Sequence, residues 1–256
     1  MRSMFYGIGY GLSAGDSFRL IREAGFDGTF VPWGDEYGEG CRALPDLARE
    51  AGLFVESAHT PYGTIDDLWR DTADGVALAD SFLRYVTDCA EREIPAMVMH
   101  ITSTGDPPPF NELGFERFLR IVDKAEKYGV NVAVENIRHN DYIRTVFGRV
   151  DSQRVGLCFD SGHRNCWTPR DDPAVEFGSR LMCLHLHDND GTYDRHQLPF
   201  DGNVDWASAM KSIAASSYRG GVSLEAGSYG YENKSPEEFL RITLERVKRL
   251  ENLMSP

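Results

Sequence analysis

Short apolar runs rich in strand-forming residues alternate along this chain with stretches that carry helical spacing. This alternation is typical of βα units and of a parallel sheet. Near-continuous apolar runs such as AMVMH and NVAVE suit strands that are buried on both faces. The pattern predicts eight strands, at residues 4–10, 28–33, 53–59, 96–102, 131–137, 155–160, 181–187 and 221–226.

Helical stretches lie between the predicted strands, for example at residues 16–24, 45–51, 80–91, 115–127 and 236–253. Three of the passages from helix to strand, AGFDG, AGLFV and YGVNV, carry a glycine where the helix would end. Glycine accepts the left-handed conformation that closes a helix. Eight strands with intervening helices predict a closed (β/α)₈ barrel. The alternative is a doubly wound open sheet, but GIGYGLSAG lacks the GxGxxG spacing typical of that fold.

No low-complexity segment or linker divides the 256 residues, so we predict one domain over residues 1–256. A barrel of this kind typically needs about 250 residues. The net charge is −13, from 27 basic and 40 acidic side chains. Because nucleic-acid binders normally carry a basic face, we expect no nucleic acid as a partner.

Three features of the sequence bear on cellular location: its apolar runs, its N-terminal segment and its cysteines. No apolar run approaches the roughly 20 residues that cross a bilayer, so we expect no membrane association. The N-terminus MRSMFYGIGYGL has no apolar signal-peptide region. Five cysteines without a CxxC pair favour a reducing compartment. Together these features predict a cytoplasmic protein.

Acidic and imidazole side chains gather where the predicted strands end. They are His59, His100, Glu135, Asp160, His163, His185, His187 and Glu225, with Asp194 and His196 in the loop after the seventh strand. The carboxyl ends of barrel strands converge on one mouth, so these residues are expected to meet there. Ionisable groups at the ends of apolar strands are costly unless they are paired or bound to metal. Imidazole and carboxylate together suit a divalent metal such as zinc or manganese.

Several of these residues also allow a purely structural interpretation. Asp160 could cap the turn after its strand, and Glu135 could pair with Arg138. Asp194 could form a surface salt bridge with its neighbour Arg195. The full set is harder to explain in this way, and a metal site is the preferred interpretation.

The pair His185 and His187 poses a choice of ligand. Two residues apart on a strand, they point to the same side. His187 is nearer the end of the strand, so we expect it to be the ligand and His185 to lie deeper in the core.

Four segments resemble motifs of a known superfamily: VAVENIR, VGLCFDSGH, LHLHDNDGTYDRHQLPFDGNVDW and GVSLEAG. They are similar to the strand-end motifs of the xylose isomerase-like TIM barrels. That superfamily includes sugar-phosphate isomerases and epimerases, ketose 3-epimerases, inosose dehydratases and endonuclease IV. The resemblance implies a (β/α)₈ barrel with one to three divalent ions, most often zinc or manganese, and it is compatible with a homo-oligomer.

The ketose epimerases within this superfamily hold one metal with four side chains, which match Glu135, Asp160, His187 and Glu225 here. The resemblance implies that Glu135 and Glu225 exchange a proton with the carbon beside the substrate carbonyl, with His163 near a substrate oxygen. Those epimerases carry a second Glu and an Arg at offsets where this chain has Asp141 and Tyr193.

Endonuclease IV holds three zinc ions with nine ligands, and each has a matching residue in this chain. The matches are His59, His100, Glu135, Asp160, His163, His187, Asp194, His196 and Glu225. The segment DRHQLPFDG resembles that enzyme's Asp-x-His loop.

We expect a metal-dependent isomerase or epimerase of a small sugar or sugar phosphate that works through an enediolate. One alternative is a multi-zinc phosphoesterase of the endonuclease IV type, and another is a sugar-binding barrel without catalysis. Arg138, Arg164 and Arg195 are candidates for binding an anionic group of the substrate.

Overall fold

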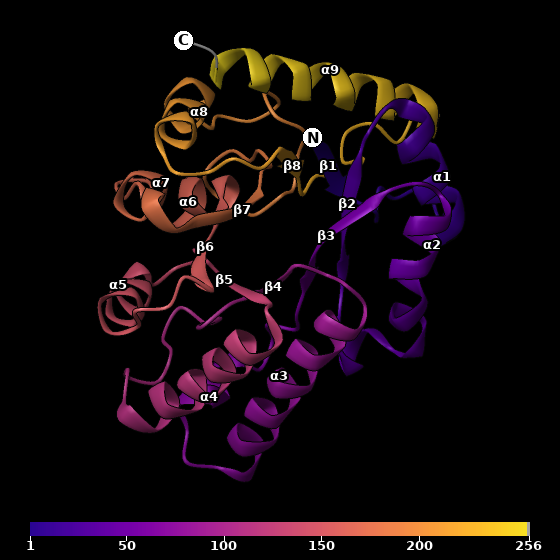
Figure 1. The fold of residues 1–256 in the computed structure, drawn as a ribbon. Coiled ribbons are helices and arrows are strands. Elements are labelled where there is room, and N and C mark those ends of the chain that lie inside the picture. Colours follow the sequence, from indigo (N-terminus) through magenta and orange to yellow (C-terminus); the bar gives the residue numbers. More distant parts are fainter. Residues whose placement is uncertain (255–256) are drawn as a thin grey trace.

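The computed structural model describes residues 1–254 and forms a parallel barrel surrounded by helices (Figure 1). Its strands are β1 (Arg2–Phe5), β2 (Gly28–Pro32), β3 (Phe54–His59), β4 (Ala96–Met99), β5 (Asn131–Glu135), β6 (Val155–Asp160), β7 (Leu181–His185) and β8 (Val222–Leu224). The sheet order is β7-β6-β5-β4-β3-β2-β1-β8, with each strand parallel to its neighbours. Leu186 closes the ring, because its N–H donates to Ser223 O at 3.0 Å and its carbonyl accepts from Glu225 N–H at 3.0 Å. The predicted (β/α)₈ class is confirmed.

The helices cover the outside of the barrel, and α9 lies against α1 and α8 (Figure 1). They are α1 (Ala14–Ala24), α2 (Leu44–Glu50), α3 (Ala73–Glu91), α4 (Glu112–Tyr128), α5 (Asn140–Arg149), α6 (Ser161–Trp167), α7 (Pro173–Glu176), α8 (Trp206–Ala215) and α9 (Pro236–Met254), with short 3₁₀ turns η1 (Asp35–Tyr37), η2 (Glu39–Ala43), η3 (Ile65–Trp69) and η4 (Gly178–Arg180). The three glycines predicted to end helices, Gly25, Gly52 and Gly129, have φ of +102°, +80° and +73°. Their left-handed conformation confirms that prediction.

The first strand is the element that the sequence misplaced. It was predicted at residues 4–10, but β1 is Arg2–Phe5. Gly9, Tyr10 and Gly11 have φ of +93°, +64° and +64°, which is incompatible with a strand. A Cβ on Gly9 would lie 2.5 Å from Ser228 Oγ, so glycine is also required for the close approach of these two loops. The glycine-rich segment therefore turns across the carboxyl end of the barrel.

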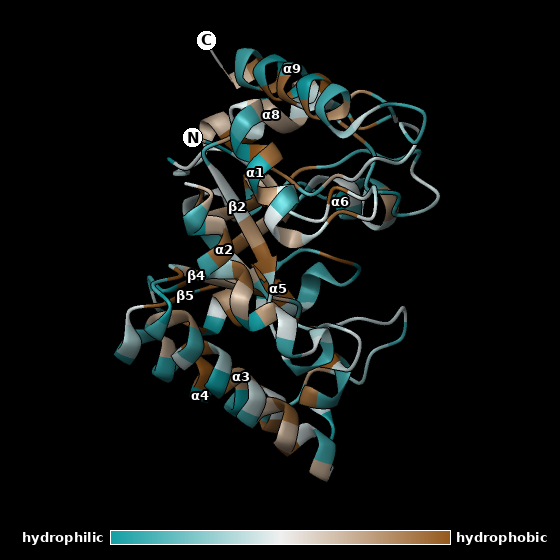
Figure 2. Ribbon diagram, turned by 90° about the vertical axis from the view of Figure 1, so that its right-hand side faces the viewer, coloured by the Kyte–Doolittle hydropathy of each residue, from teal (hydrophilic) through white to brown (hydrophobic). Residues whose placement is uncertain are grey.

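The core lies between the strands and the inner faces of the helices. In α4 the buried apolar residues Phe115, Phe118, Ile121, Val122 and Ala125 recur every three or four positions, so one stripe faces the sheet. Full burial of each large side chain stabilises the fold by about 1.5–3 kcal/mol. Figure 2 shows the same division, with hydrophobic colour on β2 and hydrophilic colour on the outer helix surfaces. Within residues 1–254, no helix combines the length and the apolar composition that a membrane span requires.

Candidate metal centre

The strand ends deliver the predicted site residues to one mouth of the barrel. His59, Glu135, Asp160 and His185 are the last residues of β3, β5, β6 and β7. His100 and Glu225 each follow directly after a strand, β4 and β8, whereas His187 lies two residues beyond β7. His163 is in the first turn of α6, and Asp194 and His196 come from the loop between β7 and α8. All nine predicted residues, and His185 with them, lie in one connected cluster.

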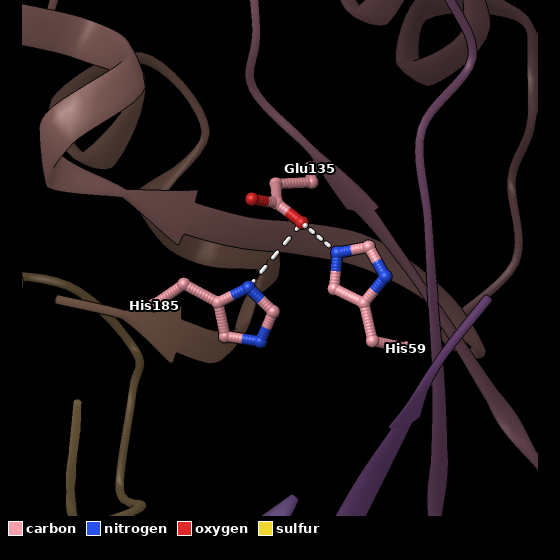
Figure 3. A group of neighbouring side chains, drawn as sticks. All are labelled: His59, Glu135 and His185. Carbon is pink, nitrogen blue, oxygen red and sulfur yellow. Dashed lines mark hydrogen bonds and ion pairs between the residues drawn. The ribbon is translucent and has the colours of Figure 1, made fainter. Parts of the chain in front are cut away.

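Glu135 is the hub of this cluster. Its Oε2 atom lies 3.1 Å from His59 Nε2, 3.3 Å from His100 Nε2 and 3.3 Å from His185 Nδ1. Its Oε1 atom lies 3.2 Å from His163 Nδ1. Figure 3 shows His59 and His185 approaching the same carboxylate oxygen from two directions. The side chain of Glu135 is completely buried, so these four imidazoles are its nearest charged or polar partners.

The charge states follow from this packing. Burial opposes ionisation of Glu135, but the neighbouring His185 and His100 outweigh it and hold its pKa well below the usual value. Burial lowers the pKa of His100, so its imidazole is neutral and offers a lone pair. Burial also disfavours the charged form of His163, but Asp160 and Asp194 raise its pKa well above the usual value. A bound cation would displace such protons, since a ligand imidazole must be neutral.

Several buried polar atoms in the cluster make no hydrogen bond within residues 1–254. They include both ring nitrogens of His100 and of His185, Glu135 Oε1 and Asp194 Oδ1. Leaving a buried donor or acceptor unsatisfied costs about 1–3 kcal/mol. A divalent cation would satisfy several of these lone pairs at once, and imidazole with carboxylate is a donor set that zinc and manganese accept. The residues present therefore fit a metal.

Four residues at the strand ends, Glu135, Asp160, His185 and Glu225, form one group whose ligand atoms all lie within 4.8 Å of one another. Glu225 Oε2 is 3.2 Å from His185 Nδ1. Burial would raise the pKa of Glu225, but His185 holds it well below the usual range, so the side chain is a carboxylate.

This group contains His185, whereas His187, the expected ligand, lies in two adjoining groups that could also hold a metal, one with Asp160 and His163 and one with His196 and Glu225. His185 pairs with Asp160 in the β6–β7 register, and its ring stacks on Phe30 at 4.5 Å. His185 is deep in the core, as expected. The carboxylates of Glu135 and Glu225 lie at the same depth and contact it. Sequence reasoning noted that the two histidines share a side and assigned no ligand role to His185.

His187 also approaches the loop residue Asp194. His187 Nε2 lies 3.2 Å from Asp160 Oδ1 and 3.5 Å from Asp194 Oδ1. Asp194 Oδ2 lies 3.3 Å from His163 Nε2 and 3.2 Å from His196 Nε2. Burial raises the pKa of Asp194, but hydrogen bonds from His163 and His196 lower it far more. Hydrogen bonding to Asp194 outweighs burial at His196 and raises its pKa to about 9.

The close approach of His187 to α6 explains why the motif FDSGH has an aspartate and a glycine at positions 160 and 162. Asp160 caps this helix, with Oδ1 accepting from His163 N–H at 2.6 Å, as the structural interpretation anticipated. Its Oδ2 atom remains 3.2 Å from His187 Nε2, so capping and ligand geometry coexist. A Cβ on Gly162 would lie 1.9 Å from His187 Cε1. Glycine at this position is what lets the His187 ring reach Asp160.

The long motif HDNDG…NVDW is organised by Asp188, a residue to which sequence reasoning gave no role. Its buried carboxylate accepts from Phe200 N–H at 2.8 Å, Val204 N–H at 3.0 Å and Trp206 Nε1–H at 2.7 Å. It also accepts from the N–H of Asn189 at 2.9 Å. These bonds fix both ends of the loop that carries Asp194 and His196. The acid before the loop and the tryptophan after it, in HDNDG…NVDW, were the available signal.

The two salt-bridge alternatives are not formed within residues 1–254. Arg138 makes no ion pair with Glu135 and instead donates to Ser103 O at 2.9 Å. Arg195 pairs with Asp190 at 3.0 Å rather than with Asp194. Both carboxylates are thus left to the imidazole cluster.

A cavity of about 540 Å³ opens over the cluster. Seven of the nine predicted residues border it: His59, His100, Glu135, His163, Asp194, His196 and Glu225. Asp160 and His187 lie beneath them, without exposed surface. A second hollow of about 430 Å³ adjoins the first across His59, Tyr62, His196 and Glu225. This size suits a small molecule, since ligand pockets typically measure about 300–1,000 Å³.

Comparison with known families agrees with this geometry. The family model of the xylose isomerase-like TIM barrel matches residues 18–250, and the chain belongs to this family. An uncharacterized protein of Sinorhizobium fredii, y4fM, is 32% identical over 250 residues, covering 82% of this chain and 79% of that protein. An uncharacterized protein of Methanocaldococcus jannaschii, MJ1311, is 27% identical over 153 residues, covering 54% of this chain and 52% of that protein.

Solved structures share the fold at low sequence identity. The D-allulose 3-epimerase from Methylomonas sp. in complex with D-allulose has a TM-score of 0.76 at 16% identity, covering 97% of this chain and 96% of that one. The IOLI protein with a bound zinc atom has a TM-score of 0.77 at 16% identity, covering 98% of both chains. At these identities the likeness establishes the fold alone.

Proposed function

We propose that the protein is a divalent-metal-dependent isomerase or epimerase of a small sugar or sugar phosphate. The observation that carries this proposal is the pair of carboxylates Glu135 and Glu225, which border one cavity from strands β5 and β8. Both are held ionised, and both contact His185, at 3.3 Å and 3.2 Å. Further support comes from the D-allulose 3-epimerase, which has a similar fold and was solved in complex with the sugar D-allulose.

The chemistry needs a base, an acid and stabilisation of negative charge. One glutamate takes the proton from the carbon beside the carbonyl, and the electron pair of the broken C–H bond forms the enediolate. The other glutamate takes up a proton from water in the cavity and returns it to carbon from its own side. His163 borders the same cavity and donates to a substrate oxygen. A divalent cation held by Glu135, Asp160, His185 and Glu225 would stabilise the negative charge of the enediolate.

A second candidate, a multi-zinc phosphoesterase, is favoured by one observation. The cluster extends beyond the four strand-borne residues to His59, His100, Asp194 and His196, which is more donors than one cation uses. Further cations there would activate water and stabilise a leaving oxygen. The net charge of −13 argues for a small phosphate ester rather than DNA as its substrate.

The first experiment is elemental analysis of protein purified without added metal, followed by turnover assays on a panel of sugars and sugar phosphates. We expect about one ion per chain to suffice for sugar turnover. Glu225→Gln should lower kcat at least about 100-fold. The matched control Glu39→Gln, at an exposed position in η2, should leave kcat unchanged.

Three outcomes would count against the proposal. Unchanged turnover in Glu225→Gln would refute the assigned proton transfer. About three zinc ions per chain with cleavage of phosphate esters would favour the second candidate. Ligand binding without turnover across the whole panel would favour a sugar-binding barrel.

A further inference from the structure

The cavity over the metal centre contains a single strongly basic side chain. Arg138 is the only Arg or Lys among the described residues that border it. It follows Glu135 by three positions, just beyond β5, and so lies at the same barrel mouth. A permanently charged guanidinium at this position faces a cavity whose other charged groups are carboxylates and imidazoles.

The guanidinium is held in a fixed orientation. Arg138 Nη1 donates to Ser103 O at 2.9 Å, and Cζ lies 3.8 Å from the centre of the Trp167 ring. A cation over an aromatic face is attracted to the ring, and a planar guanidinium stacks on it. One edge is thus anchored, while the remaining N–H donors have no partner within residues 1–254.

The contrast with the other two arginine candidates is informative. Arg164 pairs with Asp172 at 3.5 Å, and Arg195 pairs with Asp190 at 3.0 Å. Arg138 has no carboxylate within 4.0 Å among the described residues, although the protein has an excess of acidic groups. Arg138 thus has no carboxylate partner within residues 1–254, although the Trp167 ring and the Ser103 carbonyl hold it in place. Its free N–H donors are available to bind an anionic ligand.

The contacts of the Trp167 and His163 rings connect Arg138 to the metal centre. Trp167 lies between Arg138 and His163, and the centres of the Trp167 and His163 rings are 4.7 Å apart. His163 in turn contacts Glu135. A small molecule whose charged end binds Arg138 therefore extends over one aromatic ring to the metal centre.

We infer that Arg138 binds a terminal oxyanion of the substrate, a phosphate or a carboxylate, and so selects anionic over neutral sugars. The inference rests on the proposed function, because it names the substrate class of the same site. The guanidinium fork matches two oxygens of either group, which a point charge does not. The hydroxyl of Ser103, on the same cavity wall, supplies a further donor.

The test is equilibrium binding by calorimetry to the metal-loaded protein, with D-fructose, D-fructose 6-phosphate and D-glucuronate as probes. We expect the oxyanion-bearing sugar to bind about ten- to hundredfold more tightly than fructose, as a charge-assisted hydrogen-bond pair does. Arg138→Gln should abolish this preference while fructose affinity stays unchanged, which also shows that the variant is folded. Arg138→Lys should retain part of it, and Arg241→Gln, a surface control on α9, should retain all of it.

The probes of this experiment distinguish a bound phosphate from a bound carboxylate. They also test the inference separately from the proposed function. A preference that depends on Arg138 for the phosphate probe assigns phosphate, and one confined to glucuronate assigns carboxylate. A preference that survives Arg138→Gln undiminished, or no preference in the unaltered protein, overturns the inference. Because binding needs no turnover, Arg138-dependent binding with no isomerisation of any sugar would refute the proposed function and leave the inference standing.

Discussion

The site has two halves that are built in different ways. The strand-borne half consists of Glu135, Asp160, His185 and Glu225, each at or directly after the end of a strand. The loop-borne half consists of Asp194 and His196, which approach His163 and His187 from the loop between β7 and α8. The side chains of Glu135 and Asp160 are 0% exposed, whereas those of Asp194 and His196 are 19% and 39% exposed.

This difference shows which contacts hold each half of the site in position. The strand-borne residues are fixed by the hydrogen-bonded ladder of the barrel, so their geometry persists as long as the barrel does. The loop-borne residues depend on hydrogen bonds within and around their loop, chief among them those to the carboxylate of Asp188 and the contact of His196 Nδ1 with Glu225 O at 2.7 Å. We therefore expect the two halves to respond separately to mutation.

The largest effect is expected for Glu135→Gln, which should disable both halves. Its carboxylate contacts His59, His100 and His185 on one oxygen and His163 on the other. Metal content measured by elemental analysis should fall about tenfold or more, and turnover of any identified substrate by at least about 1,000-fold. Full metal content in this variant would show that Glu135 is not the shared centre.

The next effect is expected for Asp188→Asn, which should disable only the loop-borne half. The amide NH₂ would face N–H donors, so the free energy of unfolding should fall by about 3 kcal/mol. Thermal unfolding measures this loss, and elemental analysis should show that ions bound by the loop are lost before those bound by the strands. Asp106→Asn, at an exposed position between β4 and α4 whose carboxylate makes no hydrogen bond or ion pair within residues 1–254, is the matched control and should change stability by less than about 0.5 kcal/mol. Equal loss from both halves would contradict the separation.

A smaller effect is expected for Gly162→Ala, which tests the contact between the halves. The added methyl overlaps the His187 ring, so the ring must move away from Asp160. The expected cost is about 1–3 kcal/mol of unfolding free energy together with weaker metal binding. Gly148→Ala, in α5 with open space around the new Cβ, should be neutral or slightly stabilising. Identical behaviour of the two variants would mean that His187 does not need this approach.

The smallest effect is expected for His196→Asn, because this side chain is the most exposed of the cluster. Its loss should weaken metal binding by the loop about tenfold and leave the strand-borne ion in place. The measurement is metal stoichiometry during stepwise dialysis against a chelator. Loss of the strand-borne ion at the same step would show that the two halves act as one.

Much of the fold was predictable because its signals are local. Alternating apolar runs gave the eight strands, and Gly25, Gly52 and Gly129 marked helix ends. The error at the first strand, predicted at residues 4–10, arose because apolar and glycine residues alternate there without staying extended. Gly9 is needed for an approach to Ser228, more than 200 residues away, which no local pattern reveals.

The gathering of the nine predicted residues was also predictable, because parallel strands of a barrel must end at one mouth. The roles within that cluster were not. His185 and His187 have the same sequence signature, and only the structure shows that His185 contacts Glu135 and Glu225 directly while His187 contacts Asp160 and Asp194. Whether these residues bind metal remains a prediction that the experiments above test.

The sequence by itself determined the barrel, the end of it that carries chemistry, and the residue types available there. These depend on periodicity and on strand direction, which are properties of short segments. The tertiary structure alone decided which imidazole faces which carboxylate, that Asp188 holds the loop, and that Arg138 has no acidic partner within residues 1–254. Those outcomes depend on distances between residues far apart in the chain, which are fixed only when the ring of strands closes.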